Sequence, residues 1–206
     1  MNTRQLVVAT GNAGKLKEIR RLLAPLGLEP LSQADFDLPA PPEDAPTFIE
    51  NALIKARAAA RATGLPALAD DSGLEVDALD GAPGIHSARY AGRHGDDAAN
   101  IELLLAELRK RPAASRAARF RCLAVYLPHA AHPAPLVGEG VWEGDIAERP
   151  RGTGGFGYDP VFRLRDRDTT AAELEPAEKD RLSHRGRALA ALVGQMRNAG
   201  IGTPAP

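Results

Sequence analysis

The stretch LPALADDSGLEVDALDGAPGIHSARYAG, residues 65–92, is the part of the chain around which the remainder can be arranged. Its apolar run 65–69 is followed by Asp-Asp-Ser-Gly at residues 70–73, and residues 74–78 then alternate between apolar and acidic side chains. An alternation with a period of two is typical of a half-buried strand. The pattern therefore predicts a strand, a tight turn at residues 70–73 and a second strand.

The predicted turn carries two adjacent acids, Asp70 and Asp71. Neighbouring carboxylates repel each other, and a nearby cation relieves that repulsion. A magnesium ion on a phosphate ester is one such cation. Ordinary turn chemistry is the alternative, because Asp and Ser side chains hydrogen-bond local amides and Gly supplies a positive φ.

The composition limits the classes of protein to be considered. With 206 residues, 44% of them hydrophobic, the chain can bury one sizeable core or two lobes that share one. A net charge of −1 argues against a broad nucleic-acid or membrane surface. The single cysteine, Cys122, excludes an intrachain disulfide and is expected in the core. The first apolar run, 6–9, is too short for a signal peptide or a membrane span, so we expect a cytoplasmic protein.

A possible phosphate site lies near the start of the chain. A buried strand is predicted at residues 5–10, and GNAGK at 11–15 then opens a helix with one apolar face. The free N–H groups and the positive helix end suit a phosphate, and Lys15 adds a cation. The loop is not a Walker loop, since Leu16 stands where a Ser or Thr would hold the metal. Carboxylates elsewhere must hold any magnesium, and a glycine-rich turn without a ligand is the alternative.

The next segments add further candidates. Residues 38–46 hold four prolines and are predicted to form an exposed loop, whose Glu43 is either a metal ligand or solvent-facing. A capping box from Thr47 to Glu50 begins a helix that carries Lys55. Downstream, the patterns predict a helix at 97–109, a strand at 117–127, a strand pair within 136–147, and helices that begin near residues 175 and 183.

The sequence RGTGGFGYDPVF, residues 151–162, places aromatic rings in a glycine-rich segment. Such rings suit stacking with a planar base, and a hairpin loop that buries its aromatics is the alternative. His184 and Arg185 lie in the first turn of the last predicted helix, where the helix dipole disfavours cations. Arg185 could therefore donate to a carbonyl oxygen on a base edge, because a guanidinium has donors and no acceptor.

Five motifs occur in a fixed order over about 180 residues: ATGNAGK, TFIENALIKA, ADDSGLEVDAL with GAPGIHSARYAG, GTGGFGYDPVF and LSHRG. Together they resemble the inosine triphosphate pyrophosphatase family, also called the Ham1 or RdgB-like non-canonical purine nucleoside triphosphate pyrophosphatases, in its bacterial form. The resemblance implies an α/β fold with an elongated mixed sheet, flanking helices and two lobes around a central active-site cleft. Because no internal repeat or linker divides the chain, we expect one domain over residues 1–200, followed by a disordered tail at 201–206.

The same resemblance implies a reaction. Members of the family hydrolyse ITP, dITP and XTP to the monophosphate and pyrophosphate with Mg²⁺, and they are homodimers. Asp71 would bind the metal and take the proton of the attacking water, and Glu43 would be a second metal ligand. The chain departs from the pattern of two glutamates and a threonine here, because Asp44 and Ala45 follow Glu43. The implied substrate-binding residues are Thr10, Gly11, Asn12, Ala13, Gly14, Lys15, Lys55, Ser72, Phe156, Gly157, Tyr158, Asp159, Lys179, His184 and Arg185.

Hydrogen bonding gives a physical reason for the choice between purine bases. Hypoxanthine and xanthine present a carbonyl acceptor at C6 where adenine presents an amino donor, so a pocket of donors such as Arg185 would be left unsatisfied by ATP. Two other functions remain open at this point. One is a pyrophosphatase of broader base preference, and the other is a nucleotide-binding sensor without catalysis.

Overall fold

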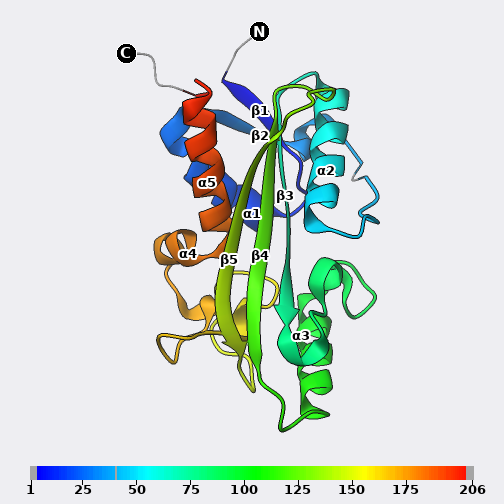
Figure 1. Cartoon of the computed structure of the whole chain (residues 1–206), viewed down its shortest axis with the longest axis vertical. Coiled ribbons are helices and arrows are strands. Elements are labelled where there is room, and N and C mark those ends of the chain that lie inside the picture. Colours follow the sequence, from blue (N-terminus) through cyan, green and yellow to red (C-terminus); the bar gives the residue numbers. More distant parts are fainter. Residues whose placement is uncertain (1–3, 40, 203–206) are drawn as a thin grey trace. The chain divides into compact units, whose positions relative to one another are not determined.

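The computed structural model describes residues 4–39 and 41–202 of the chain. Within them, six strands form one sheet in the order β2-β1-β3-β4-β5-β6 (Figure 1). The strands are β1 (Gln5–Val8), β2 (Glu29–Ser32), β3 (Ala67–Val76), β4 (Ala117–Leu127), β5 (Leu136–Ile146) and β6 (Phe162–Leu164). β1 is parallel to β2 and β3, whereas β5 is antiparallel to β6. The sheet is therefore mixed, and with its flanking helices it confirms the predicted α/β class.

The helices are α1 (Ala13–Leu23), α2 (Phe48–Thr63), α3 (Asp97–Arg109), α4 (Pro176–Leu182) and α5 (His184–Asn198). The chain divides into two compact units. Unit 1 comprises the described residues of Met1–Asp71, Cys122–Gly140 and Arg185–Pro206, and unit 2 comprises Ser72–Arg121 and Val141–His184. Among the residues described, no helix is both long and apolar enough to cross a membrane.

In unit 1, helices cover both faces of the sheet, with α1 and α5 on one side and α2 on the other (Figure 1). Leu6 and Val8 of β1 belong to a buried cluster with side chains of α1 and α5. Val7 and Ala9 belong to a second buried cluster, which contains the alanines of α2. Successive residues of a strand point to opposite faces, so every second side chain meets a different helix layer.

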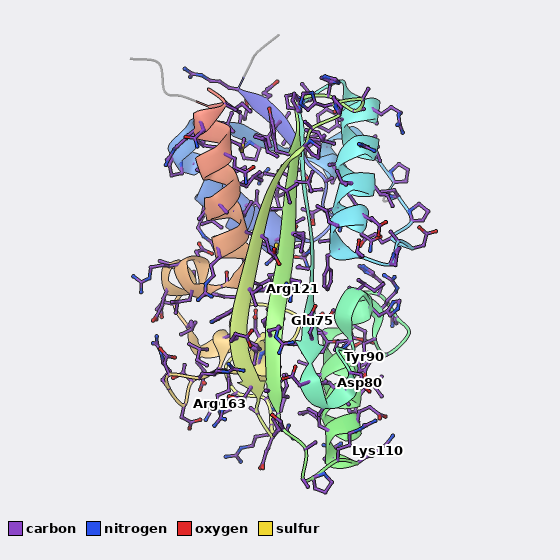
Figure 2. The ribbon with its side chains drawn as sticks, in the orientation of Figure 1. Glu75, Asp80, Tyr90, Lys110, Arg121 and Arg163 are labelled. Carbon is purple, nitrogen blue, oxygen red and sulfur yellow. The ribbon has the colours of Figure 1, made fainter. Side chains whose placement is uncertain are left out.

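In unit 2, one face of the sheet is apolar and the other is charged. Phe162 lies between Phe120 and Trp142 on the apolar face, with ring centroids 4.5 and 5.1 Å away. On the charged face, Arg121 of β4 donates to both carboxylate oxygens of Glu75 on β3, at 3.1 and 3.4 Å (Figure 2). This alternation within β4 is typical of an antiparallel-type strand with one buried face.

Several elements agree with the sequence patterns. α3 and β4 have the predicted bounds, and Cys122 is fully buried in β4. α2 begins after its N-cap Thr47 and ends at Gly64, which has a φ of 69°. The two shortest strands, β2 with four residues and β6 with three, were not predicted, because so few residues carry little periodicity.

The predicted turn at residues 70–73 is wrong. β3 continues without interruption through Asp70, Asp71, Ser72 and Gly73, and both acids are buried. Local turn chemistry favours solvated Asp and Ser side chains. Here the two carboxylates instead bind cations from other elements, which stabilises the extended strand.

The predicted strand pair within residues 136–147 is also wrong, because β5 is one continuous strand. Its glycines permit close packing. A Cβ atom added at Gly138 would overlap the carbonyl oxygen of Ala188 and would lie 2.8 Å from the backbone nitrogen of Leu192. α5 therefore packs with its backbone directly against β5 at this position.

The end of the chain is described only in part. Ile201 donates its backbone N–H to the carbonyl oxygen of Met196 at 2.8 Å. The predicted disordered tail covers residues 201–206, of which 203–206 lie outside the described residues. The expectation of a single domain over residues 1–200 stays a prediction.

The close approach of α5 to β5 yields a first prediction. Gly138→Ala should lower the free energy of unfolding by about 1–3 kcal/mol, because the added methyl group overlaps the α5 backbone. Gly194→Ala is the matched control, since a Cβ there meets nothing within 4 Å. That change should raise stability by about 0.5–1 kcal/mol through helix propensity. Urea unfolding of both variants measures the difference, and a Gly138→Ala variant as stable as wild type would contradict the packing.

Candidate active site

β3 delivers two carboxylates to the two faces of the sheet in unit 1. Asp70 is on the same face of the strand as Leu68, which packs against α1 and α5. Asp71 is on the opposite face with Ala69, which packs against α2. Because side chains alternate along a strand, adjacent acids meet different partners. In the structure the two acids therefore take part in two separate ion-pair clusters.

The Asp70 cluster consists of Asp70, Lys15, Arg185 and Glu18. Asp70 Oδ2 lies 3.1 Å from Lys15 Nζ and 3.2 Å from Arg185 Nε. Arg185 Nη1 donates to Glu18 Oε2 at 2.7 Å. The side chains of Asp70 and Arg185 are 0% and 2% exposed, so the cluster joins β3, α1 and α5 inside unit 1.

The charges of this cluster fix the protonation of Asp70. Burial alone raises the pKa of a carboxyl. The attraction of Lys15 and Arg185 outweighs burial and holds the pKa of Asp70 far below its usual range. Asp70 is therefore an anion at any ordinary pH, and its role is to pair cations rather than to exchange a proton.

The glycine loop before α1 has the geometry expected of an anion site. Asn12 is the N-cap of α1 and its Oδ1 accepts from the backbone N–H of Lys15 at 3.0 Å. Thr10 Oγ1 accepts from the backbone N–H of Asn12 at 3.1 Å. Gly11, Asn12 and Ala13 are exposed, so this helix start is open to solvent. The first turn of α1 contains no acidic residue, which keeps the positive end of the dipole available.

The Asp71 cluster consists of Asp71, Lys55 and Glu43. Lys55 Nζ lies 2.9 Å from Asp71 Oδ1 and 3.2 Å from Glu43 Oε2. Burial lowers the pKa of Lys55, but Asp71, Asp70 and Glu43 raise it more, so the ammonium stays charged. For Asp71, burial outweighs the attraction of Lys55 and raises the pKa of the carboxyl above its usual value. Asp70 and Asp71 thus differ in acidity although they are neighbours.

The Asp71 cluster supplies some of the oxygen ligands that Mg²⁺ would need. Mg²⁺ prefers oxygen ligands and is commonly held by one or two carboxylates together with water and substrate phosphates. Two carboxylates, from Asp71 and Glu43, converge on one ammonium group here. The described residues contain no group of three or more His, Cys, Asp or Glu side chains arranged to hold a metal ion.

Sequence reasoning assigned no role to Asn51, which positions the loop that carries Glu43. Asn51 on α2 is 1% exposed, accepts from the backbone N–H of Ala45 at 3.1 Å and donates to the Ala45 carbonyl at 3.2 Å. This pair of hydrogen bonds ties the proline-rich loop to the helix that also carries Lys55. The only signal in the sequence was its place inside the motif TFIENALIKA.

Unit 2 holds the second group of predicted residues. Asp159 Oδ2 accepts from Lys179 Nζ at 2.7 Å and from the backbone N–H of Phe156 at 2.8 Å. The Lys179 ammonium lies 4.8 Å from the centroid of the Phe156 ring. Asp97, which the sequence analysis missed, accepts from the backbone N–H of Gly157 at 2.7 Å. Asp159 and Lys179 therefore hold the glycine-rich loop and its half-buried Phe156 in place.

Three other predicted residues have structural partners. Tyr158 is 4% exposed and its hydroxyl donates to the Ser87 carbonyl at 2.9 Å. His184 is buried and stacks on Phe120 with ring centroids 4.6 Å apart. Ser72 is half-buried in β3. Their proposed contacts with a nucleotide stay predictions.

Arg185 has a different explanation from the one its position in the sequence favoured. A cation at a helix N-terminus is disfavoured by the dipole, and the sequence argument used a base carbonyl to offset this. The structure provides two carboxylates, from Asp70 and Glu18, in the same place. The ion pairs account for the cation without a ligand, and a direct contact between Arg185 and a base stays a prediction.

Comparison with known proteins identifies the class of protein. Residues 6–195 match the model of the Ham1 family, so the chain belongs to this family. A dITP/XTP pyrophosphatase of Thioalkalivibrio sulfidiphilus is 54% identical over 193 residues, which cover 94% of this chain and 98% of that protein. One from Shigella flexneri is 53% identical over 194 residues, with the same shares covered.

Solved structures agree. A Ham1 protein from Coxiella burnetii has a TM-score of 0.87 and 47% identity over 94% of this chain and 98% of that chain. A nucleoside-triphosphatase, or dITP/XTP pyrophosphatase, from Mycobacterium abscessus has a TM-score of 0.72 and 48% identity over 92% of this chain and 98% of that chain.

The buried Asp70 cluster yields a second prediction. Asp70→Asn should lower the free energy of unfolding at pH 7 by about 3–5 kcal/mol, because it leaves buried cations without their carboxylate. The lowered pKa of Asp70 stabilises the fold fully above the unfolded-state pKa of about 3.9, and this stabilisation is lost progressively as the pH falls from there toward the lower pKa of the folded state. The loss caused by Asp70→Asn should therefore shrink at pH 3.

Asp77→Asn is the control, since Asp77 forms an ion pair with Arg119 on the surface of unit 2. That change should cost less than about 1 kcal/mol. Urea unfolding at pH 7 and pH 3 measures both variants. Equal losses for the two substitutions, or a loss for Asp70→Asn that does not depend on pH, would be incompatible with the assigned role.

Proposed function

We propose that this protein is a nucleoside triphosphate pyrophosphatase that hydrolyses dITP, ITP and XTP to the monophosphate and pyrophosphate. The observation that carries the proposal is the Asp71 cluster, in which a carboxylate of raised pKa lies beside a charged lysine and a second carboxylate. This arrangement occurs in a chain that is more than half identical to relatives named dITP/XTP pyrophosphatase over nearly their whole length.

The triphosphate is assigned to unit 1. The exposed start of α1 offers N–H groups and a positive dipole end, and its loop is shaped by Thr10 and Asn12. Lys15 and Lys55 supply two cations, each now paired with an aspartate of β3. A bound triphosphate would add negative charge beside these lysines, which favours its binding.

Magnesium completes the proposed site. Asp71 and Glu43 would hold the ion, because they supply the oxygen ligands that Mg²⁺ prefers. When bound, it neutralises part of the triphosphate charge. Lys55 keeps both carboxylates close together before the substrate arrives.

Asp71 is the proposed base for the attacking water. Its Oδ1 accepts from Lys55 at 2.9 Å, which leaves Oδ2 to receive the proton. In the site without metal, burial raises the pKa of Asp71, and a carboxylate that is less acidic takes a proton more readily. Asp70, whose pKa is lowered, is unsuited to the same task.

The residues proposed to contact the base of the nucleotide are Phe156, Lys179 and His184. Phe156 would stack on the planar base, and its ring is held by the Asp159 and Lys179 contacts. Lys179 and His184 would contribute donors toward the carbonyl oxygens of hypoxanthine or xanthine. Arg185 could contribute only if its ion pairs with Asp70 and Glu18 rearranged.

We further propose that the protein is a cytoplasmic homodimer, on the strength of its resemblance to a family of homodimeric enzymes that act on nucleotide pools. Light scattering of the purified protein should give twice the mass of one chain. A mass equal to one chain across the concentration range would contradict the dimer.

The role of Asp71 is tested by an isosteric substitution. Asp71→Asn keeps a hydrogen-bond acceptor for Lys55 but removes the base, so kcat for pyrophosphate release from ITP with Mg²⁺ should fall about 10²–10⁴-fold. Binding of the nucleotide, measured by calorimetry, should change only severalfold. Asp77→Asn serves again as the control and should keep full activity. A fully active Asp71→Asn enzyme would remove Asp71 from the catalytic role.

A further inference from the structure

Unit 2 contains a cavity that takes no part in the proposed reaction. Its volume is about 440 Å³, and its walls come from the end of β5, residues 147–151, β6 and two residues from other segments, Arg116 and Asp168. This volume lies within the range of sites that hold small molecules. None of the residues assigned above to the metal, the triphosphate or the base lines it.

The charge of the walls is unbalanced. Four arginines face two acids, which leaves an excess of two positive charges. The charged wall residues are Arg116, Arg149, Arg151, Arg163, Glu148 and Asp168. A concave surface with a net positive charge concentrates anions from solution.

Two of the arginines have carboxylate partners in the chain. Arg151 Nη1 and Nη2 donate to the carboxylate of Asp168 at 3.0 and 3.1 Å. Arg163 of β6, labelled in Figure 2, lies 3.7 Å from Asp145 Oδ2. Arg151 has a second carboxylate partner, because its Nε lies 3.6 Å from Glu173 Oε2. These ion pairs compensate the charges of Arg151 and Arg163 on structural grounds.

Arg116 and Arg149 carry the excess. Arg116 Nε and Nη2 donate to the carbonyl oxygens of Ile146 and Ala147, at 2.5 and 2.9 Å, which fixes the guanidinium group at the cavity wall. In the part of the chain that the structure describes, neither arginine forms an ion pair. Burial lowers the pKa of Arg116, Glu148 raises it and Arg163 lowers it again, with a net decrease. The half-buried guanidinium of Arg116 thus has the like charge of Arg163 nearby, and Glu148 compensates its own charge only in part.

We propose that this cavity binds a phosphate oxyanion, either inorganic phosphate or the phosphoryl group of a small metabolite. Guanidinium groups present paired N–H donors that match the oxygens of a phosphate, and charge-assisted hydrogen bonds of this type are among the strongest in proteins. The site is independent of the proposed hydrolysis.

The cavity adjoins the glycine-rich loop through Arg151. This residue begins the loop, and its carbonyl oxygen accepts from the Thr170 hydroxyl at 2.9 Å. The next turn is held by Gly154, whose backbone N–H donates to the Ala172 carbonyl at 3.0 Å. An anion bound by Arg151 and its neighbours should therefore also perturb the backbone amides of residues 152–157.

The test is a titration of the full-length protein with inorganic phosphate, without magnesium, followed by backbone amide chemical shifts. The amides of Ala147, Glu148, Arg149, Arg151 and Arg163 should shift together and saturate. Shifts at residues 10–15 report the proposed triphosphate site in the same sample, so the two sites are separated. A titration with pyrophosphate, which carries more charge, should saturate the cavity amides at lower concentration.

Two substitutions in the cavity wall should change phosphate binding in opposite directions, and a third serves as the control. Arg149→Gln should weaken phosphate binding at the cavity by about two- to fivefold, as expected for one exposed ion pair. Glu148→Gln should tighten it by a similar factor. Arg109→Gln is the matched control, because it removes the same charge from an exposed end of α3 outside the cavity, and it should leave binding unchanged.

The variants change exposed residues, so an unaltered amide spectrum without phosphate is expected and verifies folding. Shifts confined to residues 10–15 would overturn the proposal. So would cavity shifts whose dissociation constant is the same in Arg149→Gln, Glu148→Gln and Arg109→Gln. The phosphoryl group of a metabolite, as opposed to free phosphate, is indicated if a nucleoside monophosphate saturates the cavity amides at lower concentration than inorganic phosphate.

Discussion

The alternation of side chains along β3 is the constraint on which the rest of unit 1 depends. Asp70 and Asp71 are neighbours in sequence, but the strand sends one toward α1 and α5 and the other toward α2. Each carboxylate then meets its own lysine, at 3.1 and 2.9 Å. A turn at this point would have placed both carboxylates in solvent. The buried Lys55 and Arg185 would then each have lost an aspartate partner and kept only Glu43 and Glu18, respectively.

This separation explains how two adjacent acids can have different tasks. Asp70 pairs with Lys15 and Arg185, its pKa is lowered, and it holds helices to the strand as a permanent anion. The pKa of Asp71 is raised by burial, and the carboxyl has one oxygen beyond the contact with Lys55. The environment on each face of the sheet thus gives Asp70 a structural role and suits Asp71 to the catalytic role proposed for it.

The sequence predicted the elements whose bounds depend on local periodicity. It failed where contacts with residues distant in the sequence determine the local structure. α3 and β4 have their predicted bounds, because each repeats apolar residues over more than ten positions. The strand through Asp70 was missed because its cation Arg185 lies 115 positions away. Likewise Asp97 gave no signal of its role, since it accepts from the backbone N–H of Gly157, which lies 60 positions away. The order of the motifs predicted which residues form the candidate site, and their roles in it stay predictions.

The central claim is the bond that is cleaved and the base that is selected. The most direct measurement incubates the purified protein and Mg²⁺ with ITP, XTP, GTP or ATP and follows pyrophosphate and orthophosphate separately. The account predicts pyrophosphate from ITP and XTP, with ATP turned over at least about tenfold more slowly. Equal rates for all four bases would indicate a broader pyrophosphatase. Orthophosphate alone, or no turnover of any nucleotide, would contradict the assigned reaction.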